Sequence, residues 1–152
     1  MNRIVVGLLI YISQVCAVHG QESDLLKLYK AKFPDAPAVF VERSEVLSIL
    51  VKDDSLEIFG DLLEDMLHLK EQTDAYSAGR VYGSHFIRVK DLKAKTLIWD
   101  KNKFKEMHVT EFKKNNDQDD GIFYDDSYNY SFNFPSVSLG NRTHLQYRTL
   151  IK

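Results

Sequence analysis

The sequence predicts a mainly β fold, an antiparallel β-sandwich with a short N-terminal helix. The strongest indication is a run in which four aromatic residues alternate with small polar residues: Tyr128, Tyr130, Phe132 and Phe134. Such alternation places all four rings on one face of a strand. After a turn between Pro135 and Gly140, a second run, Thr143 to Ile151, also alternates. We therefore expect the two runs to pair as antiparallel closing strands that share an aromatic core face.

Residues 1–20 are predicted to be a secretory signal peptide. Arg3 supplies a short positive start, an apolar run follows from Ile4 to Val18, and Gly20 is small enough to precede a cleavage site. The run is shorter than the roughly 20 apolar residues that span a bilayer, so we expect export to the periplasm or the exterior, without stable membrane insertion after cleavage. The residues before Cys16 make a poor lipobox, so we expect no lipid anchor there.

Cleavage after residue 20 leaves 132 of the 152 residues, enough for one domain. We divide them into an N-terminal helix and linker, 21–36, and a β-sandwich domain, 37–152. The single cysteine, Cys16, is lost with the signal, which excludes disulfides and a thiol nucleophile from the mature chain. Loss of Arg3 leaves 19 basic against 22 acidic residues, a formal charge of −3, so no basic surface for nucleic acid is expected.

The first predicted elements are a helix and a long strand. Ser23 can cap a helix whose apolar positions recur at helical spacing up to Lys32, and Phe33-Pro34-Asp35 ends it. After Pro37 the period changes to two, which predicts a strand followed by a polar turn from Lys52 to Ser55. Five aliphatic residues fall on one face of that strand: Val39, Val41, Leu47, Ile49 and Val51.

The segment from Leu56 to Leu69 is ambiguous. Its apolar residues, including Phe59, Leu63 and Met66, recur at helical spacing better than they alternate. Gly60 would weaken a helix by about 1 kcal/mol, and the preceding strand requires a hairpin partner. Local pattern alone therefore leaves helix and strand both open.

Further strands are predicted along the chain. Alternation indicates one from Val81 to Lys90, continued as far as Ile98, and another from Phe104 to Phe112, with a turn at residues 100–103 between them. Lys113 to Asp120 contains no apolar residue and is expected to be a solvated loop.

No residue pattern predicts a catalytic or metal site. The mature histidines lack the i, i+4 spacing of a helical metal site: His68, His85, His108 and His144. The acidic segment before Gly121 fails as a calcium loop because Ser127 stands where a bidentate glutamate is required. Ser84 lacks the second flanking glycine of a nucleophile elbow. We therefore expect no enzyme activity, no metal and no cofactor in this chain.

The aromatic stripe is interpreted as core, because four rings on one strand face ordinarily fill a sandwich. Exposed rings would instead offer a stacking surface for envelope glycans or peptides. In that case we expect the binding residues to be Trp99, Tyr124 and Tyr128.

Several segments, taken in order, resemble the domain of unknown function that lies ahead of transglutaminase-like catalytic domains in many exported bacterial proteins. The best single marker is the Phe-Tyr-Asp-Asp run followed by Phe-Pro-Ser and a glycine. The matching segments are Phe33-Pro34-Asp35-Ala36-Pro37-Ala38-Val39, Ser44-Glu45, Leu97-Ile98-Trp99, Lys103-Phe104, Gly121-Ile122-Phe123-Tyr124-Asp125-Asp126, Phe132-Asn133-Phe134-Pro135-Ser136, Gly140 and Tyr147.

The resemblance implies a β-sandwich, and it implies that Leu56 to Leu69 is a strand. It also implies that chemistry belongs to a partner, a transglutaminase-like domain with a papain-like Cys-His-Asp triad, downstream or on a separate chain. The expected function is a non-catalytic module that accompanies or positions that domain. The alternative is a free-standing envelope protein that binds glycans or peptides through exposed aromatic residues.

Overall fold

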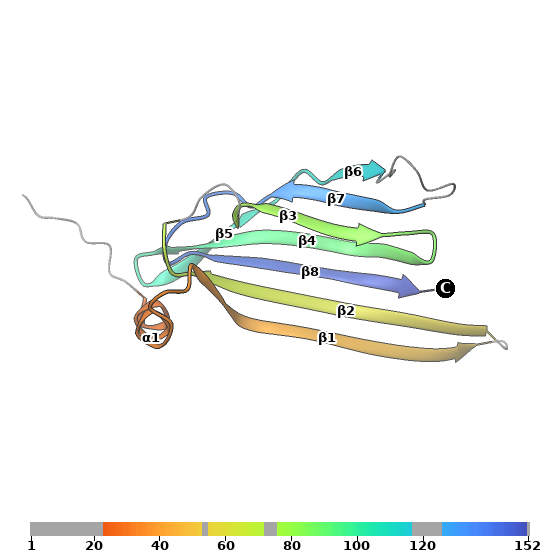
Figure 1. The fold of residues 1–152 in the computed structure, drawn as a ribbon, viewed down its shortest axis with the longest axis horizontal. Coiled ribbons are helices and arrows are strands. Elements are labelled where there is room, and N and C mark those ends of the chain that lie inside the picture. Colours follow the sequence, from red (N-terminus) through yellow and green to blue (C-terminus); the bar gives the residue numbers. More distant parts are fainter. Residues whose placement is uncertain (1–22, 53–54, 72–75, 117–125, 152) are drawn as a thin grey trace, which may run out of the picture.

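The computed structural model describes residues 23–52, 55–71, 76–116 and 126–151, which form one short helix and two antiparallel sheets. The larger sheet has the strand order β1-β2-β8-β4-β5 and the smaller one β3-β7-β6 (Figure 1). The predicted fold class, a mainly β sandwich with a short N-terminal helix, is therefore confirmed. The elements are α1 (Asp24–Lys32), β1 (Ala38–Lys52), β2 (Ser55–His68), β3 (Ala78–Gly83), β4 (Ile87–Asp100), β5 (Lys103–His108), β6 (Lys113–Asn116), β7 (Tyr128–Asn133) and β8 (Arg142–Ile151).

Helix α1 forms where its capping residue and apolar spacing predict it. The Ser23 hydroxyl accepts a hydrogen bond from the backbone N–H of Leu26 at 3.2 Å, which satisfies one of the free donors of the first turn. Leu26 is buried and packs with Leu67 and Leu69. This small core lies on the face of the large sheet that points away from the small sheet. We call this face the outer face, and the face toward the small sheet the inner face.

Leu56 to Leu69 folds mainly as strand β2, as the family resemblance implies and against its helical periodicity. β2 has a strand on either side, β1 and β8, so tertiary pairing overrides local preference. Gly60 allows the close approach of β8, because a Cβ at this residue would lie 2.7 Å from Oγ1 of Thr149. The glycine that weakens a helix is therefore a packing requirement of the strand.

A β-bulge divides strand β1 and corrects one prediction. The register shifts between Phe40 and Glu42, so residues before and after the bulge do not keep one alternation. Val39 and Val41 pack in the core beneath α1. Leu47, Ile49 and Val51 lie on the opposite face, so the prediction of a single shared face is wrong.

The aromatic strand and the closing strand do not pair with each other, which corrects a second prediction. β7 pairs with β3 and β6, whereas β8 pairs with β2 and β4. Their apolar sides meet across the sandwich instead, where Phe132 and Leu145 are buried in one cluster with Val81 and Ala94. The interpretation of the aromatic stripe as core holds for Phe132, which is buried, and for Phe134, which packs against its cluster, whereas Tyr128 and Tyr130 are half-buried and lie outside that cluster.

The predicted strand from Val81 to Lys90 is two strands in different sheets. The Ser84 hydroxyl accepts hydrogen bonds from the N–H groups of Phe86 and Ile87, at 3.2 and 3.1 Å, and so builds the turn between β3 and β4. The strand predicted from Phe104 ends at His108 as β5, and the chain then crosses to the small sheet.

The predicted loop after Phe112 begins with a strand. β6 pairs with β7, and the Asn115 side-chain amide donates to Asn129 Oδ1 at 3.2 Å and to Ser131 Oγ at 2.9 Å. Hydrogen bonding between polar side chains therefore replaces apolar packing on this edge. The remainder of that loop, from residue 117, lies outside the described residues.

Candidate functional site

A row of ionisable side chains crosses the outer face of the large sheet. Strand register places one residue from each of the five strands in this charged row: Glu42, Asp65, His144, Lys95 and His108. Residues directly opposite in adjacent strands have neighbouring side chains on the same face. The sheet therefore gathers five groups that are far apart in the sequence.

A buried ion pair anchors the charged row. Asp65 is only 4% exposed, and Nε of Arg142 donates to its Oδ1 at 2.8 Å while Nη2 donates to Oδ2. Nδ1 of His144 lies 3.4 Å from the same Oδ2. A bidentate ion pair of this kind holds both side chains in one geometry, so the centre of the row is rigid.

The other end of the charged row is more exposed. Nζ of Lys95 donates to Oε1 of Glu106 at 2.6 Å, and Nε2 of His108 lies 3.3 Å from Oε2 of the same carboxylate. The hydrogen bond from Lys95 holds the pKa of Glu106 below its ordinary value. The carboxylate is therefore ionised and bridges a lysine and a histidine.

His108 and His144 line one hollow of about 180 Å³, whose walls include apolar Leu92, Val109 and Phe112. No sequence pattern predicts that the two histidines share a hollow, because they lie on different strands, β5 and β8. Both strands pair with β4, and both histidines lie opposite Lys95. Their proximity can be predicted only when the register of these strands is known.

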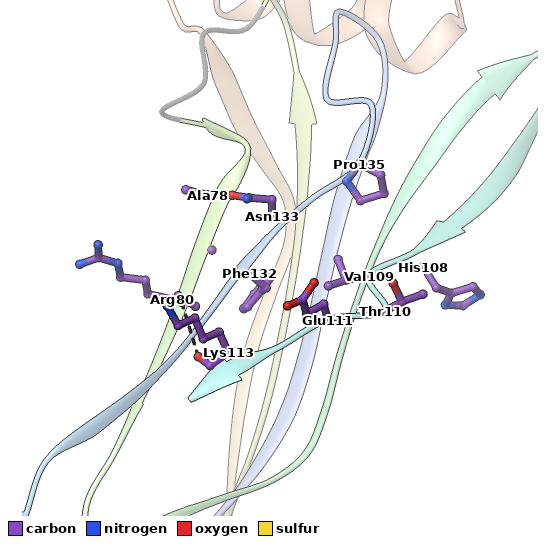
Figure 2. A pocket seen from close by; sticks show the side chains of 12 residues that line it. Ala78, Arg80, His108, Val109, Thr110, Glu111, Lys113, Phe132, Asn133 and Pro135 are labelled. Atoms are coloured by element: carbon purple, nitrogen blue, oxygen red, sulfur yellow. Dashed lines mark hydrogen bonds between the residues drawn. The ribbon is translucent and has the colours of Figure 1, made fainter. Parts of the chain in front are cut away.

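A second hollow of about 540 Å³ adjoins the first, and His108 and Val109 line both. Figure 2 shows that the side chains lining this hollow belong to β3, to β7 and to the segment that joins β5 to β6. Lys113 and Glu111 supply charges of both signs, while Arg80 extends away from the other lining residues (Figure 2). The arrangement offers hydrogen bonds and mixed charge to a polar ligand or protein surface.

The described residues contain no group of three or more His, Cys, Asp or Glu placed to hold a metal ion. His68 is separate from the charged row and fully buried, with its Nε2 3.1 Å from Oγ1 of Thr143. Burial lowers the pKa of His68 to about 4, so its ring is neutral at pH 7. His85 lies in the exposed turn between β3 and β4.

The predicted aromatic site residues do not come together. Trp99 is half-buried near the end of β4, where its ring packs edge-on against Phe104 at 4.9 Å. Tyr128 is half-buried near the opposite end, where its hydroxyl accepts from the Val89 N–H at 3.2 Å. Val89 and Trp99 lie ten residues apart on β4, or about 30 Å. Tyr124 lies outside the described residues.

The most exposed aromatic residues of the described chain are others. Tyr82 is 56% exposed near the end of β3, and Phe86 is 63% exposed in the turn that follows. Neither was predicted as a site residue, because strand alternation does not distinguish the open end of a sheet from its covered middle.

The arrangement defines the protein as a two-sheet antiparallel β-sandwich with a charged outer face. A crystal structure of a putative protease from Parabacteroides distasonis ATCC 8503 is similar, with a TM-score of 0.58 and 16% sequence identity. The match covers 76% of this chain and 23% of that chain, so the shared fold is less than a quarter of the larger protein. No family model and no curated protein matches the sequence. In the described part of the chain, no helix has the length and apolar character to cross a bilayer.

Proposed function

We propose that the mature chain is a non-catalytic, exported β-sandwich module that accompanies and positions a transglutaminase-like domain. The observation that supports this most is the structural match, in which the same fold occupies 23% of a longer chain described as a putative protease. A fold used as one part of a larger protein has neighbours to position. A papain-like Cys-His-Asp triad, carried downstream or on another chain, would supply the chemistry.

The residue chemistry of the mature chain is that expected of a non-catalytic module. Its sequence after residue 20 contains no cysteine, so it has no thiol that a neighbouring base could activate. Asp65 of the charged row is held by Arg142, and Lys95 of the row is paired with Glu106. Paired charges of this kind give an interface specificity and orientation rather than reactivity.

The surface proposed for the partner consists of the charged row and the two adjoining hollows. Protein interfaces combine packed centres with polar rims that carry direct hydrogen bonds. The hollow in Figure 2 provides such groups from Glu111, Lys113 and Asn133. His108 lines both hollows and also belongs to the charged row, so it is the residue whose loss should weaken the contact most.

The test uses a transglutaminase-like domain found in the reading frames that adjoin this one. Purified separately, that domain should bind the mature chain, residues 21–152, in isothermal titration calorimetry and should melt at a higher temperature in its presence. The mature chain alone should release no product from casein or from a glutamine donor peptide. Absence of binding together with an unchanged melting temperature would overturn the proposal.

A matched pair of histidine variants locates the contact. His108→Ala should reduce the affinity for the partner domain by about tenfold, a loss typical of a substantial interface residue. His85→Ala removes an exposed histidine in the turn between β3 and β4 and should bind as the unmodified chain does. Equal affinities of the two variants would place the contact on another surface.

Binding of envelope glycans or peptides through Trp99, Tyr124 and Tyr128 stays a prediction. The distance of about 30 Å between the first and last of these residues gives it no shared surface on which to act. The module reading is therefore the better supported of the two.

A further inference from the structure

The large sheet carries an uncovered apolar surface on its inner face, the side that elsewhere contacts the small sheet. Strand register places Leu47 opposite Gly60, Ile49 opposite Ile58, and Val51 opposite Leu56, all on this face. The next strands continue the surface, because Ile58 lies opposite Ile151 and Ile151 lies opposite Ile87. We call these residues the apolar face: Leu47, Ile49, Val51, Leu56, Ile58, Ile87 and Ile151.

The apolar face continues the surface that forms the sandwich core. Leu145 and Tyr147 lie on the same side of β8 as Ile151, and they pack against the small sheet. The core cluster between the sheets contains no described residue of β1 or β2. In Figure 1, β1 and β2 lie beyond β8, on the side away from β3, β7 and β6. The small sheet therefore ends before it covers the β1–β2 hairpin.

The exposure of this face is large. Leu47, Ile49, Val51 and Leu56 are each between 56% and 78% exposed. At roughly 100 Å² of exposed surface for each such side chain, the apolar face leaves on the order of 500 Å² in water. A standard interface buries about 800 Å² on each partner, and this face supplies most of that area before its polar margin is counted.

The distribution of charge favours a second copy of the chain as the occupant. Among the described residues, the inner face carries no charged side chain from the row of Leu47 and Gly60 to the row of Val51 and Leu56, since Asp61 and Arg148 lie on the outer face. The nearest described charges of the inner face lie toward the base of the hairpin: Glu45, opposite Leu62, and the ion pair of Arg43 with Glu64. Because the apolar face itself carries no charge, two copies can meet there in the self-complementary contact of a two-fold dimer.

We propose that the apolar face is the interface of a homodimer, in which the β1–β2 hairpins of two copies pack with their inner faces together. The dimer extends the sandwich arrangement, because each hairpin gains the opposing sheet that its own molecule does not provide. The face includes none of the charged-row residues. A failure to form the dimer would therefore leave the proposed binding to a transglutaminase-like domain unaffected, and the reverse also holds.

Sedimentation velocity of the mature chain between 1 and 100 µM tests the dimer. The unmodified chain should sediment as a dimer at the upper end of this range. Ile49→Thr, which keeps a β-branched residue in the strand, should weaken association at least tenfold with an unchanged circular dichroism spectrum. Val46→Thr is the matched control, because Val46 is 57% exposed on the outer face of the same strand and should leave the dimer intact. A monomeric unmodified chain, or equal association of both variants, would overturn the proposal.

Cross-linking gives a second, independent readout, because the mature chain has no cysteine of its own. Under mild oxidation Ile49→Cys should form a disulfide-linked dimer, whereas Val46→Cys should remain monomeric on a non-reducing gel. Cross-linking of the second variant alone would place any association on the outer face and would contradict the proposed interface.

Discussion

Replacing Gly79 with alanine tests the closest contact in the sandwich core. Gly79 on β3 lies opposite Phe132 on β7, and a Cβ at residue 79 would lie 2.3 Å from Cε2 of that ring. Phe132 is 5% exposed, and its ring packs edge-on against Phe112 at 5.1 Å and Phe134 at 5.3 Å. The ring cannot move aside without displacing its neighbours.

The magnitude follows from two opposing effects. Forcing a methyl group into a packed core costs about 1–3 kcal/mol. Replacing glycine restricts the unfolded chain, which returns about 0.4–1 kcal/mol. We therefore expect Gly79→Ala to lower the free energy of unfolding by about 1–2 kcal/mol and the melting temperature by roughly 3–8 °C.

Urea unfolding of residues 21–152, followed by far-ultraviolet circular dichroism and tryptophan fluorescence, measures this loss. Gly83→Ala is the matched control: its Cβ would lie 2.5 Å from Cζ of Tyr128, but that ring is only half-buried and can swing outward. Gly83→Ala should therefore lower the free energy of unfolding by less than Gly79→Ala does. Phe132→Leu should cost less in the Gly79→Ala background than in the unmodified chain, because the clash is gone. A Gly79→Ala protein as stable as the original, or fully additive effects, would refute the reasoning.

Two further changes probe the polar groups. Asp65→Asn leaves the buried side of Arg142 without its ionic partner and should lower the free energy of unfolding by about 3–5 kcal/mol, whereas Asp61→Asn, at the exposed pair with Arg148, should have a barely measurable effect in the same urea titration. Burial lowers the pKa of His68 from 6.5 to about 4, so in this range the unfolded chain binds a proton that the folded protein does not. Stability should therefore be complete above about pH 6.5 and fall by on the order of 2–3 kcal/mol toward pH 4; a His68→Gln variant that keeps the full pH dependence would contradict this.

The sequence predicts which face of a strand a side chain lies on better than it predicts which strands pair with each other. Alternation from Tyr128 to Phe134 correctly placed Phe132 and Phe134 in the core between the sheets, because side-chain direction in a strand depends only on local periodicity. The same pattern carries no information on which strand lies alongside. Pairing with the run from Thr143 was therefore predicted where the structure has packing across the sandwich.

Turns inside continuous alternation were the second source of error. Alternation runs on through Gly83-Ser84-His85, yet the chain changes sheets there because Ser84 satisfies the N–H groups of the turn. At Asp100–Lys103 the turn was predicted correctly. There, Lys101 and Asn102 adopt left-handed backbone conformations, with φ of 46° and 66°, suited to a tight hairpin.

The candidate site lay beyond sequence reasoning for a physical reason. Each charged-row residue is an ordinary polar position on its own strand, and only the combined register of β1, β2, β8, β4 and β5 aligns them. Register depends on bulges such as the one between Phe40 and Glu42, which local pattern does not reveal.

The central position of β8 has a consequence for how the protein folds. The β1–β2 and β4–β5 hairpins can each form from neighbouring residues, but they share no pairing with each other until β8 enters between them. Closing the large sheet therefore requires contacts at long sequence separation, such as Asp65 with Arg142, which slow folding. During synthesis, the edges of β2 and β4 must stay unpaired until residues 142–151 emerge. A nascent chain that has not yet produced this segment presents two open strand edges, which are the places where strands of other chains can add.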